Sequence, residues 1–193
     1  HGLEKQTTTE TADQIQQGIA KEILRFHVLA NSDSEEDQKL KLEVKDRLVD
    51  YMKDILDGAE DVKETKKRIT ENQETICLVA EQEIQKRGYT YPVSVNLEKC
   101  YFPMKTYGDC TFPAGTYEAL RVCIGKAKGR NWWCVLYPGL CFADSVNVIV
   151  PDEKKEELKN ILTEEEYESL FDWREDDYQI RSGFLRLWRK LFA

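Results

Sequence analysis

One histidine inside the chain is the first candidate for chemistry. His27 lies in the apolar segment "EILRFHVLA", and Asn31 and Asp33 follow where that segment ends. A general base needs a polar group that orients its ring, and Asp33 is near enough in sequence to act as one. The alternative, which the local pattern favours, is that His27 makes a local hydrogen bond while Asn31 and Asp33 close the turn and cap a helix. Because carboxyl ends of strands often form binding sites, this corner is also a candidate binding surface.

The segment "NWWCVLYPGLCF", residues 131–142, is the second candidate. Cys134 and Cys141 flank a Pro-Gly pair, and such a turn can bring two sulfurs together. A disulfide closing a ring of that size would stabilise the loop by roughly 2–3 kcal/mol. Trp132 and Trp133 are adjacent, so on a strand they face opposite sides, and one of them needs a cover beyond the core of its own sheet. A stapled hairpin that completes the core and a rigid aromatic loop that anchors a partner explain this pattern equally well.

Residue spacing disfavours metal binding, thiol catalysis and phosphate binding. The six cysteines include no CxxC pair, and His27 is the only nitrogen ligand within the chain. Structural zinc sites usually contain such pairs, so we expect no metal and no cofactor. A hydrolase that pairs His27 with a cysteine or a carboxylate is the alternative hypothesis, but no cysteine opens a helix or follows a Gly-rich turn. The segment "GKAKGRN" precedes a strand-like segment, whereas a phosphate loop opens a helix.

Charge is distributed unevenly along the 193 residues. The net charge is −8, and residues 151–178 hold 12 acids against 4 bases, so the rest of the chain is balanced. The basic amphipathic end, residues 179–193, holds four bases and no acid. We expect it either to dock on the domain or to contact a membrane surface peripherally. An acidic chain without a long basic face is a poor nucleic-acid binder, and no apolar run reaches the roughly 18 residues that span a membrane.

The hydrophobic pattern predicts an α+β fold. Residues 1–18 are polar and threonine-rich, so we expect a disordered tether there and a single domain over residues 19–193. A buried strand, Glu22–Ala30, is followed by helices at about 35–57 and 60–87, strands at 90–102, 118–125 and 131–137, a candidate strand at 144–150, and an acidic helical region at 151–178. This order predicts a mixed, mostly antiparallel sheet with helices packed on one face, and it leaves the strand order open.

Three segments carry a resemblance to a known family. They are "ILRFHVLANSDSEEDQKLKLEVKD", "YFPMKTYGDCTFPAGTYEALRVCIGKAKGRNWWCVLYPGLCF" and the terminal "GFLRLW". In this order they resemble the stage II sporulation protein R family, over most of residues 19–144. The resemblance implies a signalling protein that is not an enzyme, exported from the forespore of an endospore-forming bacterium into the space between forespore and mother cell. It further implies activation of a membrane-embedded aspartic protease of the mother-cell membrane, which cleaves the inactive precursor of sigma-E.

The resemblance does not define contact residues, so the expected partner surface rests on residue chemistry. Large aromatic side chains beside bases are typical of interface hot spots. The predicted surface consists of Trp132, Trp133 and Tyr137 with Lys105, Tyr107 and Asp109 of the "KTYGD" connection. The corner of His27, Asn31 and Asp33 is the second candidate. The location implied by the resemblance is oxidising, which agrees with the even number of cysteines and supports a disulfide between Cys134 and Cys141.

Overall fold

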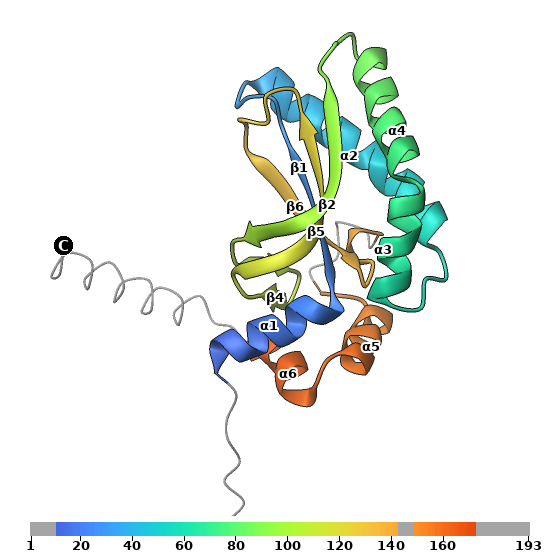
Figure 1. The fold of residues 1–193 in the computed structure, drawn as a ribbon. Helices are drawn as coiled ribbons and strands as arrows, with labels where there is room; N and C mark the ends of the chain where they lie inside the picture. The colour runs from blue at the N-terminus through green and yellow to red at the C-terminus, as the bar shows by residue number, and fades with distance from the viewer. Residues whose placement is uncertain (1–10, 143–148, 173–193) are drawn as a thin grey trace, which may run out of the picture.

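The computed structural model describes residues 11–142 and 149–172. A four-stranded sheet forms the centre of the fold, in the order β2-β5-β1-β6 (Figure 1). The strands are β1 (Leu24–Leu29), β2 (Val93–Phe102), β5 (Gly115–Ile124) and β6 (Asn131–Tyr137). β1 runs parallel to β5 and antiparallel to β6, and β2 runs antiparallel to β5. The predicted α+β class, with a mixed and mostly antiparallel sheet, is therefore confirmed.

One face of the sheet is covered by the predicted layer of helices. These are α2 (Glu35–Leu56), α3 (Val62–Glu71) and α4 (Gln73–Lys86). Alternate residues of β1, such as Phe26 and Val28, point to this layer and share an apolar core with Val44 and Leu48 of α2. The single helix predicted for residues 60–87 is wrong, because Asn72 ends α3 and precedes α4.

A second apolar core lies on the other side of β1. It is enclosed by α1 (Ala12–Glu22), α5 (Asp152–Ile161), α6 (Glu164–Asp172), the turn η1 (Leu140–Phe142) and a hairpin of β3 (Lys105–Tyr107) and β4 (Cys110–Phe112). Figure 1 shows α1, α5 and α6 together at the lower end of the molecule. All six residues of β1 are buried. The face of β1 that is turned toward this second core carries two polar side chains, Arg25 and His27, which are therefore buried as well.

Helix α1 corrects the predicted tether. Thr11 and Gln14 form a capping box, in which Gln14 N donates to Thr11 Oγ1 at 3.3 Å and Thr11 N donates to Gln14 Oε1 at 2.8 Å. Ile19 is fully buried. Gly18 allows α1 to lie close to α6, because a Cβ at this position would overlap the carboxylate of Glu166. The disordered tether predicted for residues 1–18 is therefore wrong for residues 11–18, and residues 1–10 lie outside the described part.

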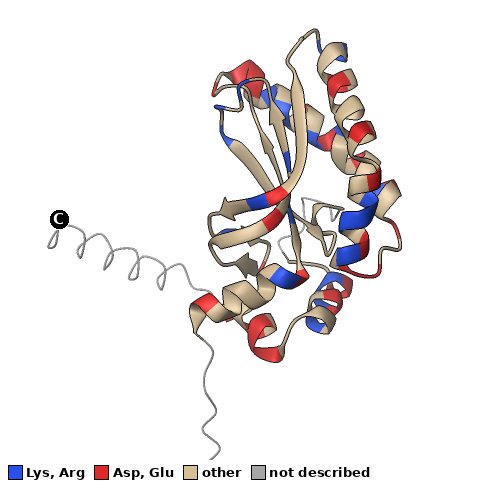
Figure 2. Cartoon of the chain, in the orientation of Figure 1, with Lys and Arg blue, Asp and Glu red and all other residues tan. Residues whose placement is uncertain are grey.

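The C-terminal predictions are tested only in part. The acidic region predicted at 151–178 is helical in α5 and α6, and α6 begins with three acids in its first turn (Figure 2). Residues 173–178, the basic end 179–193 and most of the strand predicted at 144–150 lie outside the described residues. Within the described ranges, no helix is both long enough and apolar enough to cross a membrane. The single domain over residues 19–193 stays a prediction.

Candidate partner-binding site

A cleft of about 520 Å³ opens between α2, β6 and the β3–β4 hairpin. Its walls include Trp132, Trp133 and Tyr107, three residues of the predicted partner surface, together with Cys134 and Cys141. Helix α2 contributes two lysines and two aspartates to the wall. Because β6 is the outermost strand of the sheet formed by the described residues, side chains from both of its faces can border the same cleft. We refer to this site as the tryptophan cleft.

The two tryptophans face opposite sides of β6, as predicted for neighbouring strand residues. Trp132 packs edge-on against Phe26 in the first core, with 5.4 Å between the ring centroids. Trp133 turns to the second core, where it stacks on His27 at 5.1 Å and meets Phe102 edge-on at 4.8 Å. Both indoles stay half-buried. The chain itself therefore covers part of each tryptophan, and the other described residues leave the rest of each indole exposed to the cleft.

A fully buried arginine, which the sequence did not single out, lies beneath the cleft. Arg25 Nε donates to Cys134 O at 3.2 Å, and Nη2 donates to the Tyr107 hydroxyl at 3.1 Å. Four aromatic rings surround the guanidinium, the nearest being Phe102 at 4.4 Å and Tyr117 at 4.9 Å. No carboxylate of the described ranges forms a salt bridge with it. Ring faces and two oxygens therefore hold its charge, and it fixes two groups of the cleft wall.

Tyr107 is held as a neutral phenol by this arrangement. Burial raises the pKa of Tyr107 far above its usual value, although the positive charge of Arg25 lowers it. Lys105, which precedes it by two residues on β3, places its Nζ 5.8 Å from the ring centroid of Trp133. Lys45 of α2 lies 4.9 Å from the ring centroid of Trp132. Each indole therefore has a lysine over its ring, and the site combines aromatic surface with charges of both signs, since Lys45 also forms a salt bridge with Asp46.

His27 is not arranged as a general base. Only 4% of the residue is exposed, and its ring lies 5.1 Å from Trp133 and 5.0 Å from Phe102. Neither ring nitrogen has a hydrogen-bond partner in the described part of the chain. Burial, followed by the charges of Arg121 and Arg25, lowers the pKa of His27 from 6.5 to about 4. A neutral imidazole that no described carboxylate orients does not form the pair that the hydrolase hypothesis requires.

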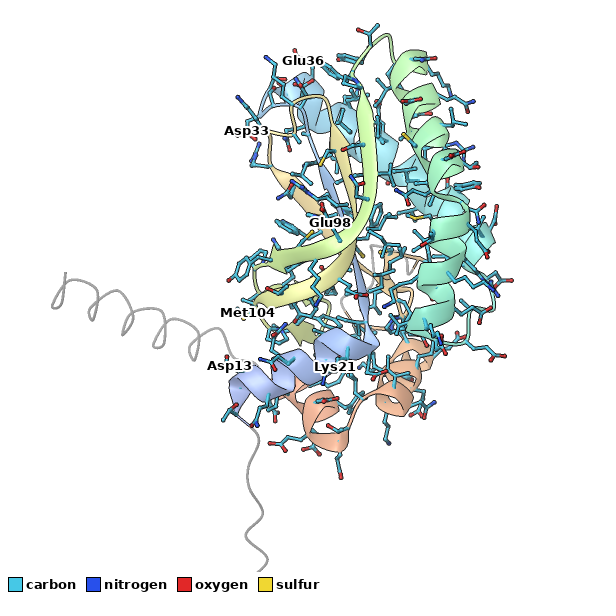
Figure 3. The ribbon with its side chains drawn as sticks, viewed as in Figure 1. Asp13, Lys21, Asp33, Glu36, Glu98 and Met104 are labelled. Atoms are coloured by element: carbon cyan, nitrogen blue, oxygen red, sulfur yellow. The ribbon has the colours of Figure 1, made fainter. Side chains whose placement is uncertain are left out.

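Asn31 and Asp33 fix the corner of the sheet and make no hydrogen bond to His27. Asn31 Oδ1 accepts from Lys126 N at 2.9 Å, and Asp33 Oδ1 accepts from Arg130 N at 2.7 Å. These bonds hold the β5–β6 loop against the chain that leads into α2, at the end of the sheet where Asp33 is labelled in Figure 3. The neighbouring Ser34, and neither of these two residues, caps α2. Asn31 and Asp33 therefore tie two loops together, whereas neither the predicted helix cap at these residues, nor the predicted local hydrogen bond of His27, nor the base-orienting pair is formed in the described part of the chain.

The predicted residues Asp109 and Tyr137 do not line the tryptophan cleft. Asp109 Oδ1 accepts from the main chain of Val150 at 3.0 Å and Oδ2 accepts from Lys155 at 2.6 Å, which ties the hairpin to α5. Burial raises the pKa of Asp109, but these hydrogen bonds lower it by a larger amount, so the pKa of Asp109 lies below its usual value. The Tyr137 hydroxyl donates to Glu60 O at 3.0 Å and borders a second cleft of about 650 Å³. Both side chains support the fold around the site.

The cysteines predicted to pair are neighbours, but all six cysteines of the structure are thiols. Cys141 Sγ donates to Val135 O at 2.9 Å. Burial, followed by a hydrogen bond with Cys134, raises the pKa of Cys141 well above its usual value. Burial also raises the pKa of Cys77 and Cys100, which is the opposite of an activated thiol. Disulfide formation between Cys134 and Cys141 stays a prediction.

Comparison with known proteins defines the family. The fold and the cleft describe an α+β domain with a candidate binding site, and within the described ranges no group of three or more His, Cys, Asp or Glu side chains could hold a metal ion. Residues 20–147 match the family model described as stage II sporulation protein R. The chain is 35% identical over 164 residues to stage II sporulation protein R of Bacillus subtilis (strain 168), which covers 82% of this chain and 71% of that protein. The chain therefore belongs to the stage II sporulation protein R family. No solved structure shows a significant match.

Proposed function

We propose that this protein is a secreted sporulation signal that activates a membrane-embedded aspartic protease. It is exported from the forespore into the space between forespore and mother cell. There it binds the protease of the mother-cell membrane and triggers processing of the pro-sigma-E transcription factor. Membership of the stage II sporulation protein R family is the observation that carries this proposal. The protein acts as a ligand of the protease and is not itself an enzyme.

Of the surfaces of this protein, the tryptophan cleft is the one best suited to bind the protease. Trp132 and Trp133 are held by packing on their inner sides, so little side-chain entropy is lost when their outer surfaces are covered. Lys45 and Lys105 lie over the two rings and supply charge at the same place. Buried aromatic anchors beside cations are the usual source of interface hot spots.

The alternative hypothesis, an extracytoplasmic hydrolase, has less support. His27 is buried and has a pKa of about 4, so it is already neutral and has no described partner that would tune it for proton transfer. Cys141, one of the two thiols of the cleft wall, has a raised pKa. Replacement of His27 by glutamine separates the two functions, because a folded binding protein keeps its activity whereas a catalyst loses several orders of magnitude.

Co-production with the membrane protease and the sigma-E precursor tests the proposal. We expect precursor cleavage that depends on this protein. Trp132→Leu keeps apolar contact with Phe26 but removes the indole, and Lys105→Glu reverses the charge that lies over the Trp133 ring. Each variant is expected to lower cleavage about tenfold or more. Leu78→Ser is the matched control, since Leu78 is 54% exposed on α4 and does not line the cleft.

Two different failures are distinguishable in this experiment. If the folded wild-type protein gives no cleavage above background, the proposed function is wrong. If the wild type is active and both cleft variants match the Leu78→Ser control, the function stands and the cleft is the wrong surface. Circular dichroism and thermal unfolding show that each variant is folded before it is assayed.

We also propose a peripheral membrane contact through the basic end, residues 179–193. Its four bases and lack of acids support attraction to anionic lipid. Deletion of residues 183–193 is expected to reduce cosedimentation with anionic vesicles and to leave binding to neutral vesicles unchanged. Equal cosedimentation of both proteins with anionic vesicles would contradict this contact.

A further inference from the structure

Strand β2 lies at the edge of the sheet, with β5 on one side and no other described strand beside it (Figure 1). Gly125 N, just after β5, donates to Pro92 O, just before β2, at 2.8 Å. Because such bonds recur at every second residue of the ladder, the main-chain groups of the even-numbered residues of β2 are directed at β5. In an antiparallel ladder the intervening residues direct theirs to the opposite side. The amide and carbonyl groups of the odd-numbered residues of β2 therefore form its outer edge.

Helix α4 caps the first half of this outer edge. Gln73 Nε2 donates to Val95 O at 2.6 Å, and Cys77 Sγ lies at 3.6 Å from Val93 O as a weak donor. These two side chains occupy carbonyls that an incoming strand would need. The first half of the edge is therefore protected by the protein itself.

The second half of the edge, residues 97–101, is open. Within the described ranges, no hydrogen bond from outside the sheet reaches the outward main-chain groups of Leu97, Lys99 or Tyr101. Tyr101 is 64% exposed, and Glu98, labelled in Figure 3, and Lys99 are exposed beside it. In Figure 2 these two charges form a red and blue band within an otherwise uncharged strand. An open edge of this kind is a template for a strand of another chain.

We propose that this open edge pairs with the same edge of a second copy, antiparallel and centred on Cys100. A two-fold pairing can be centred only on residue 98, 99 or 100, because Val95 O is already bonded and Pro103 has no amide hydrogen. Centring on Glu98 or on Lys99 places that charge opposite the same charge of the second copy, which is unfavourable. The third register has no like charges directly opposite.

The Cys100 register is also favourable for the residues around its centre. Lys99 of each copy lies opposite Tyr101 of the other, so the lysine stem packs on the ring and its ammonium can contact the ring face. An edge lysine normally opposes pairing. Here Lys99 excludes the register centred on itself, as Glu98 excludes the register centred on Glu98, and Lys99 has a partner in the register centred on Cys100. The strand is therefore complementary to itself, which favours a second copy over an unrelated segment.

This register places the two Cys100 residues directly opposite each other. The central pair is not a hydrogen-bonded one, so its Cα atoms are expected about 4.5 Å apart. That separation is within the range of roughly 4.4–6.8 Å that a disulfide spans. With glutathione disulfide as oxidant, the two Cys100 thiols form one disulfide and two molecules of glutathione are released. The native cysteine therefore reports the register.

Sedimentation velocity of the full chain under reducing conditions, over a range of concentrations, tests the pairing. Tyr101→Lys places a lysine opposite Lys99 in both symmetry-related pairs, and Tyr101→Glu places a glutamate there. Each of the two pairs is expected to change the dissociation constant of the dimer by a factor of roughly two to five. Because both pairs change together, the dissociation constant rises about 4- to 25-fold for Tyr101→Lys and falls by a similar factor for Tyr101→Glu. If only the loss of the tyrosine mattered, both variants would dimerise more weakly than the wild type.

Oxidation with glutathione disulfide supplies the second, independent test. We expect a covalent dimer of the wild type that is absent in Cys100→Ser and retained in Cys123→Ser, the matched control on β5. Wild type that stays monomeric at every concentration, charge variants that shift in the same direction, or a covalent dimer that persists in Cys100→Ser would each overturn the proposal. The experiment uses the isolated protein, so its outcome is independent of the proposed protease activation.

Discussion

A fall in pH from 7 to 5 is expected to destabilise this protein through His27. Burial, followed by the charges of Arg121 and Arg25, holds the pKa of the folded residue at about 4, against 6.5 for an exposed histidine. Between these two values the unfolded chain binds a proton that the folded chain does not bind. The contribution to stability is therefore complete above about pH 6.5 and is lost progressively as the pH falls toward 4.

The magnitude follows from the difference between the two pKa values. The pKa of His27 falls from 6.5 in the unfolded chain to about 4 in the folded protein. At 1.36 kcal/mol for each pKa unit, the total loss of stability is about 3 kcal/mol and is complete below pH 4. About 2 kcal/mol of this is lost between pH 7 and pH 5, because the unfolded histidine is already almost fully protonated at pH 5. Domains of this size are typically stable by about 5–15 kcal/mol, so the loss is large enough to measure.

Urea unfolding at pH 7, 6 and 5, followed by tryptophan fluorescence, measures this loss in wild type and in His27→Gln. Glutamine cannot titrate, so the variant is expected to lose about 2 kcal/mol less than the wild type over this range, whatever its stability at pH 7. Asp37 and Asp109, whose pKa values are lowered, are present in both proteins and act at lower pH. Equal losses in the two proteins would refute the reasoning about His27.

The other predictions concern packing and the cleft. Arg25→Met replaces a guanidinium that forms no described salt bridge by an apolar chain, and it is expected to lower the free energy of unfolding by about 1–3 kcal/mol. Arg25→Ala leaves a cavity and is expected to lower it by about 3–5 kcal/mol. Equal losses in chemical unfolding would contradict this packing. Gly18→Ala is expected to lose about 1–2 kcal/mol through its clash with Glu166, and to gain about 1 kcal/mol in a Glu166→Ser background, which a double-mutant cycle measures. Oxidation of Cys134 and Cys141 is expected to raise stability by about 2–3 kcal/mol and to add a disulfide detectable by mass spectrometry, with Cys141→Ser as the control.

Elements with long, regular patterns were predictable from the sequence. The continuous apolar segment around Phe26 predicted a buried strand, and β1 is buried along its whole length. The apolar spacing from Leu40 to Met52 predicted α2, and both residues lie in its buried face. In these elements the local pattern and the tertiary packing agree, so one implies the other.

Elements that depend on distant contacts were missed. Helix α1 contains few apolar residues and exists because Ile19 enters the second core, whose other buried members, apart from Ile23, come from residues 102–170. The break at Asn72 was hidden because apolar spacing continues from α3 into α4, while the Asn72 side chain itself donates to Arg68 O at 2.8 Å. The β3–β4 hairpin has strands of only three residues, too short for alternation to be visible.

The candidate site also contains one feature that the sequence predicted and one that it did not. Adjacency alone predicted that Trp132 and Trp133 face opposite sides, and the structure confirms it. The importance of Arg25 was not predictable, because the four rings around it come from β2, β3, β4 and β5. The available signal was a lone charge within "ILRFHVLA". A buried strand with one arginine requires a compensating environment somewhere in the chain, but the strand pattern does not say where.

The edge position of β6 explains how two neighbouring tryptophans can serve both folding and binding. A central strand would bury both faces between layers, whereas an edge strand leaves the outer side of each indole uncovered. The same residues therefore hold the two cores and border the cleft, so their replacement by alanine changes stability and binding together. Lys105 contacts the cleft only through its position over Trp133 and is absent from both cores. Its charge reversal is consequently the change that separates a binding role of the cleft from a purely structural one.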